Sequence, residues 1–205
     1  KEHFNQNDYS GSWTVIALRS QTGNAEDILA NDSEQPFIDT PLLAQCHYFK
    51  ELLDAMLFEK ETVRLLRLQA GSVVKPHRDM GLAYRFGCFR LHIPLATHTS
   101  VEFMVGGENI PMKEGECWYA DFDQTHSVNN ESSQERIHLV IDGKRNDWTD
   151  RLFADAGYDF EEEKRRTDYS LETKKQMIEQ LRQMKTDVAD EMIKKLELEI
   201  GNSTA

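Results

Sequence analysis

The sequence predicts a mostly β protein, a sandwich or barrel of many short strands, with helices before and after it in the chain. Residues 62–143 carry short segments rich in β-branched and aromatic residues, which is the composition of strands. Turn signals such as Ala70-Gly71 and Asn129-Asn130-Glu131 separate these segments. Many short strands at this rhythm are typical of sandwiches and barrels. The predicted strands cover residues 62–68, 72–75, 88–95, 100–105, 110–112, 117–122 and 136–142.

The segment before this region predicts one further strand and one helix. Residues 12–18 predict the strand, and residues 20–35 predict a loop. Residues 41–57 predict a helix packed on a sheet, because apolar residues recur there every three or four positions. A capping residue directly before proline, in Asp39-Thr40-Pro41, supplies the start signal of this helix.

The segment after this region predicts one charged helix from Ser170 to Ile200 with a single apolar stripe. The stripe consists of residues spaced by three or four: Met177, Leu181, Met184, Val188, Met192 and Leu196. Such a stripe packs on the domain or on a second copy of the chain, which would form a homodimer. We therefore expect residues 1–148 to form the β domain with its N-terminal strand and helix. Residues 149–205 are expected to form a C-terminal helical extension.

Composition and charge narrow the class of protein. The chain has 205 residues, 39% of them hydrophobic, and a formal net charge of −12, which disfavours nucleic acid because its phosphates would be repelled. No stretch approaches the ~18 consecutive apolar residues of a membrane span. The chain does not begin with Met, and Lys1 to Asn5 carry no apolar signal-peptide core. Cys46, Cys88 and Cys117 lack the spacing of a zinc site, and they predict reduced core thiols of a cytoplasmic protein.

His77 and Asp79 are the first candidates for a functional site. They lie two residues apart in a segment predicted to be extended, so both side chains face the same way. His126, predicted at the end of the strand over 117–122, supplies a third group. Two imidazoles and one carboxylate on one face of an octahedron form the facial triad of Fe(II) oxygenases. The alternative is that His77 is an ordinary loop histidine, because an isolated His-x-Asp occurs in many chains.

Arg136 strengthens the case for a metal-dependent oxygenase. It follows His126 on the predicted strand 136–142, and a buried arginine can hold a carboxylate with two parallel hydrogen bonds. The cosubstrate 2-oxoglutarate needs such a partner for the carboxylate that lies far from the metal. Arg90 and His92, again two residues apart, are expected to face the same cavity. Their alternatives are a surface arginine and a histidine of the core.

These groups occur in a specific order over residues 62–143. In chain order they are His77-x-Asp79, Arg90-Leu91-His92-Ile93-Pro94-Leu95, Gly115-Glu116, Phe122-Asp123-x-x-His126, Arg136 and Val140-Ile141-Asp142. This order resembles the aspartyl/asparaginyl β-hydroxylase family. The resemblance implies a double-stranded β-helix, which is a jelly-roll and cupin-like fold, and a requirement for Fe(II), 2-oxoglutarate and O2.

The resemblance also implies a role for each matched residue. It assigns the metal to His77, Asp79 and His126, and 2-oxoglutarate to Arg136, Arg90 and His92. Asp79 matches a carboxylate ligand that is kept in bacterial small-substrate members, such as the free-proline cis-hydroxylases. One departure is Leu66, which stands where the animal members place a polar contact to 2-oxoglutarate. Arg64 and Arg67 are the candidates to replace that contact.

The implied activity is hydroxylation of an unactivated C–H bond in an amino acid, a peptidyl residue or a related small substrate. The segment between Asp79 and the predicted strand 88–95 is a candidate substrate lid. It contains Arg78, Tyr84, Arg85 and Phe86. Arg85 is either a carboxylate partner for the substrate or a solvated loop arginine.

Two other classes of protein compete with the oxygenase. The first is a non-oxygenase cupin, either an isomerase or a metal-dependent sensor. Gly71 followed by His77-x-Asp79 imitates the first cupin motif, and Pro111, Gly115 and His126 loosely echo the second. Arg136 with Arg90 argues against it, because a cupin that binds no dicarboxylate needs no arginines beside its metal. The second is an inactive binding module that retains the fold.

Overall fold

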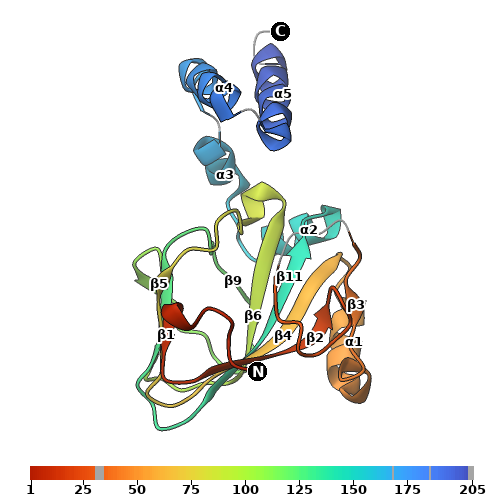
Figure 1. Ribbon diagram of the computed structural model, residues 1–205, viewed down its shortest axis with the longest axis vertical. Coiled ribbons are helices and arrows are strands. Elements are labelled where there is room, and N and C mark those ends of the chain that lie inside the picture. Colours follow the sequence, from red (N-terminus) through yellow and green to blue (C-terminus); the bar gives the residue numbers. More distant parts are fainter. Residues whose placement is uncertain (31–34, 168, 185, 203–205) are drawn as a thin grey trace. The chain divides into compact units, whose positions relative to one another are not determined.

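The computed structural model describes residues 1–30, 35–167, 169–184 and 186–202, and it divides into two compact units, Lys1–Phe153 and Ala154–Ala205. The first unit consists of two antiparallel sheets (Figure 1). The six-stranded sheet has the order β3 (Ile38–Asp39), β2 (Trp13–Ser20), β4 (Lys60–Leu68), β11 (Arg136–Lys144), β6 (Cys88–Ala96) and β9 (Trp118–Tyr119). The five-stranded sheet has the order β1 (Tyr9–Ser10), β5 (Val73–His77), β10 (His126–Asn130), β7 (Val101–Val105) and β8 (Glu108–Asn109).

The hydrophobic core of this unit lies between the two sheets. Side chains of β2, β4 and β11 form one side of it, and side chains of β5, β7 and β10 form the other. Its buried members on these strands are Trp13, Val15, Leu66, Leu68, Val140, Val74, Phe103, Val105 and Val128. The chain passes from one sheet to the other after β1, β4, β5, β6, β8, β9 and β10. This is the double-stranded β-helix, so the predicted mostly β, cupin-like fold with flanking helices is confirmed.

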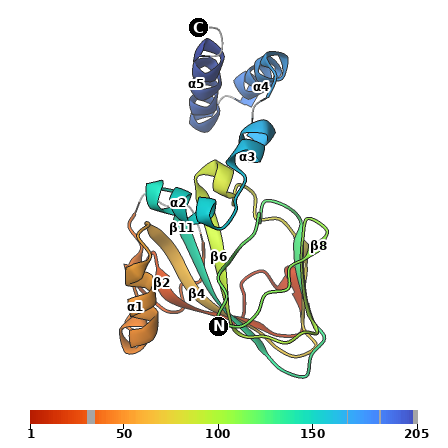
Figure 2. The same ribbon diagram turned by 180° about the vertical axis from the view of Figure 1, so that it is seen from behind.

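The N-terminal helix is shorter than predicted. In place of one helix over 41–57, a 3-10 turn at Leu43–Gln45 precedes α1 (His47–Ala55). Cys46 leaves the helical region between them, with φ −106° and ψ 67°, and Met56 is extended and ends α1. The helix lies beside the β2 end of the six-stranded sheet in both views (Figures 1 and 2), as expected from its apolar spacing.

The prediction of strands is wrong in two places. Residues 110–112 form no strand, and the strand predicted over 117–122 contracts to β9. Conversely, β10 was not predicted, because Asn129-Asn130 has the composition of a turn. The amide Nδ2 of Asn130, a fully buried residue, donates to the carbonyls of Leu68, Gln69 and Gln134. These bonds compensate the burial of a polar side chain inside a strand.

The second unit contains two helices where the sequence predicted one. Helix α2 (Asp147–Asp155) begins in the first unit and ends in the second, so the predicted boundary at 148 falls inside it. It is followed by α3 (Phe160–Thr167), α4 (Leu171–Met184) and α5 (Asp187–Asn202). Apolar spacing of three or four is the same in one long helix and in two consecutive helices, so the stripe did not reveal the break.

Part of the predicted apolar stripe packs between α4 and α5, whereas Met192, another predicted member, is 46% exposed. Ile178, Ile193 and Leu196 are buried together, with Met177, Leu181 and Ile200 packed against them. Arg182 Nη2 and Glu197 Oε1 form an ion pair of 3.2 Å across the two helices. The side chains of Met184 and Val188 lie outside the described residues. Packing of this extension on the domain or on a second copy stays a prediction.

The cysteine side chains are less buried than predicted. Cys46 and Cys88 are half-buried and Cys117 is exposed, so the expectation of core thiols is wrong. Cys88 is placed by a polar contact, because its Sγ donates to the carbonyl of Gly81 at 3.1 Å. Among the described helices, none is both long enough and apolar enough to cross a membrane.

Candidate metal centre and cavity

The register of the five-stranded sheet brings His77 and His126 together. His77 is the last residue of β5, His126 is the first residue of β10, and the two are cross-strand partners. Their ring centroids lie 4.2 Å apart. Residues directly opposite on neighbouring strands are the closest side-chain pairs of a sheet. His126 was expected at the end of the strand over 117–122, so its place in β10 is a correction.

Asp79 completes the cluster from the segment that follows β5. Its backbone N–H donates to the carbonyl of Phe122 at 3.1 Å, which ties this segment to the loop before β10. His77 Nε2 and Asp79 Oδ1 lie 3.9 Å apart. One ligand atom from each of His77, Asp79 and His126 lies within 4.8 Å of the other two. The structure therefore assembles the predicted triad from two separate segments of the chain.

The hydrogen bonds of the two histidines select the tautomer that a metal requires. His77 Nδ1 lies 2.8 Å from the carbonyl of Lys75, and His126 Nδ1 lies 3.0 Å from the carbonyl of Gln124. A carbonyl only accepts, so in the neutral imidazole each Nδ1 carries the proton and each Nε2 has the lone pair. This arrangement is characteristic of metal-ligating histidines. Burial, joined by the charges of His77 and Arg90, lowers the pKa of His126, which favours the neutral imidazole.

Asp79 is held in its ionised form by Arg90. Burial opposes ionisation, but the charge of Arg90, followed by those of His126 and His77, outweighs it and lowers the pKa of Asp79. Arg90 Nη1 donates to Asp79 Oδ2. The other oxygen, Oδ1, is the one that faces His77. A metal ligand must be deprotonated, and Asp79 meets that condition at neutral pH.

A cavity of about 860 Å³ contains the triad. The predicted site residues all line it: His77, Asp79, Arg90, His92, His126 and Arg136. Phe4, Met80 and Phe86 also line it, and these large apolar side chains are exposed by 59%, 86% and 55%. The cavity therefore has a charged interior and an apolar rim, and its volume is within the usual range of small-molecule sites.

Arg136 is a buried cation for which the described residues provide no anion. Its side chain lies in the cavity wall, and the residue is 3% exposed. Nη2 donates to His138 Nδ1 at 2.9 Å, the guanidinium lies 5.1 Å from the centre of the Phe103 ring, and Nε has no partner. Burial lowers the pKa of Arg136 to about 9. An uncompensated buried charge is costly, so a carboxylate entering the cavity would be bound strongly here.

His92 and His138 lie beside Arg136 and are buried in the neutral form. Their Nδ1 atoms are 3.2 Å apart. Burial, reinforced by the charge of Arg136, lowers the pKa of both imidazoles well below the usual value. His138 was not among the predicted site residues. The signal that would have found it is the two-residue period of a strand, which places Arg136, His138, Val140 and Asp142 on the same face of β11.

These two histidines predict that the metal-free protein loses stability in acid. Below about pH 6.5 the unfolded chain binds protons at both imidazoles and the folded chain does not, so the free energy of unfolding falls as pH falls. The slope is up to ~1.4 kcal/mol per pH unit for each histidine. Urea unfolding between pH 7 and pH 5 measures it. His138→Gln should remove the contribution of one histidine, and an unchanged slope would contradict this assignment.

The structure distinguishes the two candidates to replace the polar contact near Leu66. Leu66 lines the cavity, as does Arg64 two residues before it on β4. Arg64 is buried and forms an ion pair with Asp142, with Nη2 2.6 Å from Oδ2. Arg67 faces the opposite side of the sheet and pairs with Glu135 among exposed side chains. Arg64 is therefore the only one of the two that reaches the cavity.

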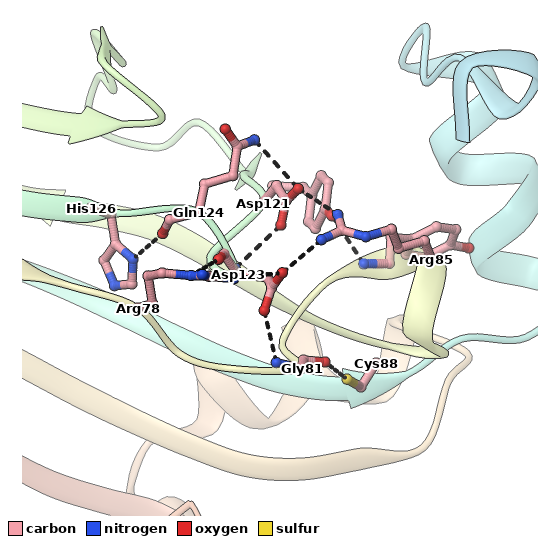
Figure 3. A network of polar contacts seen from close by, with 10 residues as sticks. Arg78, Gly81, Arg85, Cys88, Asp121, Asp123, Gln124 and His126 are labelled. Atoms are coloured by element: carbon pink, nitrogen blue, oxygen red, sulfur yellow. Dashed lines mark hydrogen bonds and ion pairs between the residues drawn. The ribbon is translucent and has the colours of Figure 1, made fainter. Parts of the chain in front are cut away.

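The candidate lid is held by two carboxylates of the loop before β10 (Figure 3). Arg85 Nη1 lies 2.5 Å from Asp121 Oδ2, and Nη2 lies 2.8 Å from Asp123 Oδ2. Asp123 also accepts from the backbone N–H of Gly81 at 2.9 Å and from Arg78. Both alternatives for Arg85 are corrected, because its guanidinium is bound to the protein's own carboxylates.

The four residues predicted in the lid have different positions. Arg78 and Phe86 line the cavity. Tyr84 is fully buried and stacks on Phe153, with ring centroids 3.8 Å apart. It therefore anchors the segment and does not face a substrate.

Removing the carboxylate of Asp123 is expected to loosen the segment over residues 78–86. Asp123→Ala deletes the acceptor of the Gly81 N–H and one partner each of Arg78 and Arg85. Hydrogen bonds to charged groups contribute ~1.5–3 kcal/mol each when buried, and less where exposed. Amide hydrogen exchange of peptides covering 78–86 should accelerate. The matched control is Glu135→Ala, an exposed carboxylate paired with Arg67, which should leave this segment unchanged.

Comparison with known proteins identifies the family. The profile of the Aspartyl/Asparaginyl beta-hydroxylase family matches residues 1–146, and the chain belongs to this family, as the order of its motifs predicted. The chain is 30% identical over 136 residues to the L-proline cis-4-hydroxylase of Rhizobium meliloti (strain 1021). The match covers 64% of this chain and 48% of that enzyme, so the chain spans about half the length of this curated relative.

The solved structures that align with this chain have low sequence identity to it. A predicted oxalate decarboxylase from Thermotoga maritima aligns with a TM-score of 0.41 and 15% identity, over 71% of this chain and 91% of that one. A cupin domain from Bordetella pertussis Tohama I aligns with a TM-score of 0.34 and 17% identity, over 44% of this chain and 88% of that one.

Proposed function

We propose that this chain is an Fe(II)- and 2-oxoglutarate-dependent dioxygenase that hydroxylates an unactivated C–H bond of an amino acid or a peptidyl residue. The observation that carries the proposal is Arg136, a buried guanidinium with no anionic partner among the described residues, in the same cavity as the cluster of His77, Asp79 and His126. Membership of the Aspartyl/Asparaginyl beta-hydroxylase family supports it independently.

The donor set fits a non-haem Fe(II) ion. His77 and His126 present their Nε2 lone pairs, and Asp79 presents Oδ1 on the same side. Two imidazoles and one carboxylate suit this metal and leave coordination positions for other ligands. When bound, the iron would supply O2 activation coupled to oxidative decarboxylation of 2-oxoglutarate to succinate and CO2.

The far end of the cosubstrate site would be formed by Arg136. Its planar guanidinium can bind a carboxylate with two parallel hydrogen bonds, and its Nε has no other partner in the described structure. His92 and Arg90 line the same cavity. They would form the wall of the cosubstrate site at the end nearer the metal. The neutral form of His92 matters because a cation there would repel both Arg136 and the metal.

Buried aromatic and aliphatic side chains would exclude water from the reacting groups. Phe103 and Phe122 line the cavity and are 4% and 1% exposed, and Val128 continues this wall from β10. Removing water strengthens each electrostatic contact in the cavity and protects a reactive oxidant from side reactions.

The substrate would enter between the apolar side chains of the rim. Phe4, Met80 and Phe86 can contact the apolar part of an amino acid or a peptidyl residue. The relative from Rhizobium meliloti is named for L-proline, which makes free L-proline the first substrate to test here. A non-oxygenase cupin remains the alternative, but it gives no reason for an uncompensated buried arginine beside the metal cluster.

Anaerobic titration of the Fe(II)-loaded protein with 2-oxoglutarate tests the proposal. We expect a metal-to-ligand absorption band to appear, and succinate to form from 2-oxoglutarate once O2 and a substrate are added. The substrate panel contains L-proline, other free amino acids and short peptides. Absence of the band in the metal-loaded wild-type protein would reject the oxygenase and favour the cupin.

A further inference from the structure

Four charged side chains form a connected chain that starts at Asp79 and ends deep in the first unit. Arg90 Nη1 donates to Asp79 Oδ2. Arg90 Nε and Nη2 bind the two oxygens of Asp142 at 2.6 and 3.0 Å. Arg64 Nη2 binds Asp142 Oδ2 at 2.6 Å. The two arginines and the two aspartates balance in charge.

Sheet register explains why these residues meet. Asp142 on β11 and Arg90 on β6 are cross-strand partners. Arg64 lies on β4, the other neighbour of β11, opposite Val140, which is two residues before Asp142. The three strands therefore place one guanidinium group on each side of the Asp142 carboxylate. Cross-strand pairs of opposite charge stabilise a sheet, and here the pairs lie in the interior of the unit.

The geometry fixes the orientation of the Arg90 side chain. Asp142 is 4% exposed and accepts a further hydrogen bond of 2.7 Å from Thr62 Oγ1. Burial opposes its ionisation, but Arg90 and then Arg64 outweigh this effect and lower the pKa of Asp142. Its carboxylate binds two nitrogens of Arg90 in a bidentate pair, which restricts the guanidinium to one plane. The third nitrogen, Nη1, then points to Asp79.

We propose that Asp142 is a positioning residue for the metal ligand Asp79 and acts through Arg90. Arg90 occupies Oδ2 of Asp79 and leaves Oδ1 for the metal on the side of His77. Partners of this kind, which hydrogen-bond a ligating carboxylate, orient it and raise metal affinity. The inference rests on the proposed function, because it requires a metal at the triad. It differs from the role that the family resemblance gives Arg90, which is a contact to 2-oxoglutarate.

The alternative is that Asp142 only neutralises two buried arginines and so contributes to stability alone. Metal affinity separates the two roles when it is measured without 2-oxoglutarate. A purely stabilising Asp142, or an Arg90 that contacts only the cosubstrate, gives no change in metal affinity for a variant that is folded. A positioning role changes metal affinity before any cosubstrate is present.

The experiment uses Arg90→Lys and Asp142→Asn in the full chain, with anaerobic titration of Fe(II) and, in parallel, of Co(II). Lysine keeps the charge but lacks the fork that spans both carboxylates, and asparagine keeps the shape of Asp142. We expect each variant to raise the dissociation constant of the metal by roughly 10- to 100-fold, as removal of such partners does elsewhere. The ligand-field absorption of bound Co(II) should also shift.

Glu135→Gln is the matched control, because it changes a carboxylate to an amide at an exposed residue directly before β11, whose partner is Arg67 on β4. It should leave metal affinity and the Co(II) spectrum unchanged. Thermal unfolding establishes which variants are folded. Asp142→Asn leaves two buried arginines with less compensation, so Arg90→Lys, which preserves the charge balance, tests the same step if the first variant is unstable.

Three outcomes are decisive. Folded Arg90→Lys protein with wild-type metal affinity and weaker 2-oxoglutarate binding would overturn the inference and assign Arg90 to the cosubstrate. Unchanged metal affinity in folded Asp142→Asn protein would overturn it as well. Failure of the wild-type protein to bind metal would instead reject the proposed function, so the two failures are distinguishable.

Discussion

Arg136→Ala is expected to weaken binding of 2-oxoglutarate to the Fe(II) protein by ~2–5 kcal/mol, the usual cost of truncating one partner of a buried charge pair. This corresponds to an increase in the dissociation constant of roughly 30-fold to several thousand-fold. The reason is that no other buried cation of the described residues is free for the far carboxylate. Arg64 and Arg90 are both engaged by carboxylates. The absorption band in the anaerobic titration measures the effect.

Two further variants make this test specific. Arg136→Lys should bind more weakly than wild type and more strongly than the alanine variant, because lysine keeps the charge and loses the bidentate geometry. Arg67→Ala removes an exposed arginine on β4 that pairs with Glu135 outside the cavity, and it should bind as wild type does. Wild-type affinity in Arg136→Ala would mean that the carboxylate is held elsewhere.

His126→Ala is expected to abolish high-affinity iron binding. One of the three proposed protein ligands is lost, so the dissociation constant should rise by more than the ~10- to 100-fold that changes in outer-shell partners cause. The same variant should show no absorption band with 2-oxoglutarate. Anaerobic metal titration followed by metal analysis of the desalted protein measures both effects.

The control for this variant is His98→Ala. His98 is exposed, and its Nδ1 accepts from the backbone N–H of Ser100 at 3.1 Å, outside the cavity. Its loss should not change iron binding. Should His126→Ala protein retain wild-type affinity, the metal site would have to be sought among other residues.

Local spacing in the sequence was sufficient for the parts of the site that lie on one strand or directly after it. His77 and Asp79, Arg90 and His92, and the inward-facing residues of β11 each follow the two-residue period of extended chain. Spacing also predicted the mostly β class, because many short β-rich segments separated by turns are compatible with few other fold classes. Its failures were local as well. Asn130 inside β10 has the composition of a turn, and the three backbone carbonyls that accept from its amide approach it only after folding.

Contacts between strands were decided by the tertiary structure alone. The register that sets His77 opposite His126 depends on pairing between β5 and β10, which are about fifty residues apart in the chain. The partners of Arg85 and Arg90 likewise come from distant segments. The sequence placed these arginines close to the candidate site. It could not show their ion-pair partners, because an ion pair depends on the positions of two side chains in the folded protein. By itself the sequence therefore determined the fold class, the family and the six candidate residues, whereas only the folded chain decided which charges are compensated and which one, Arg136, is left for a ligand.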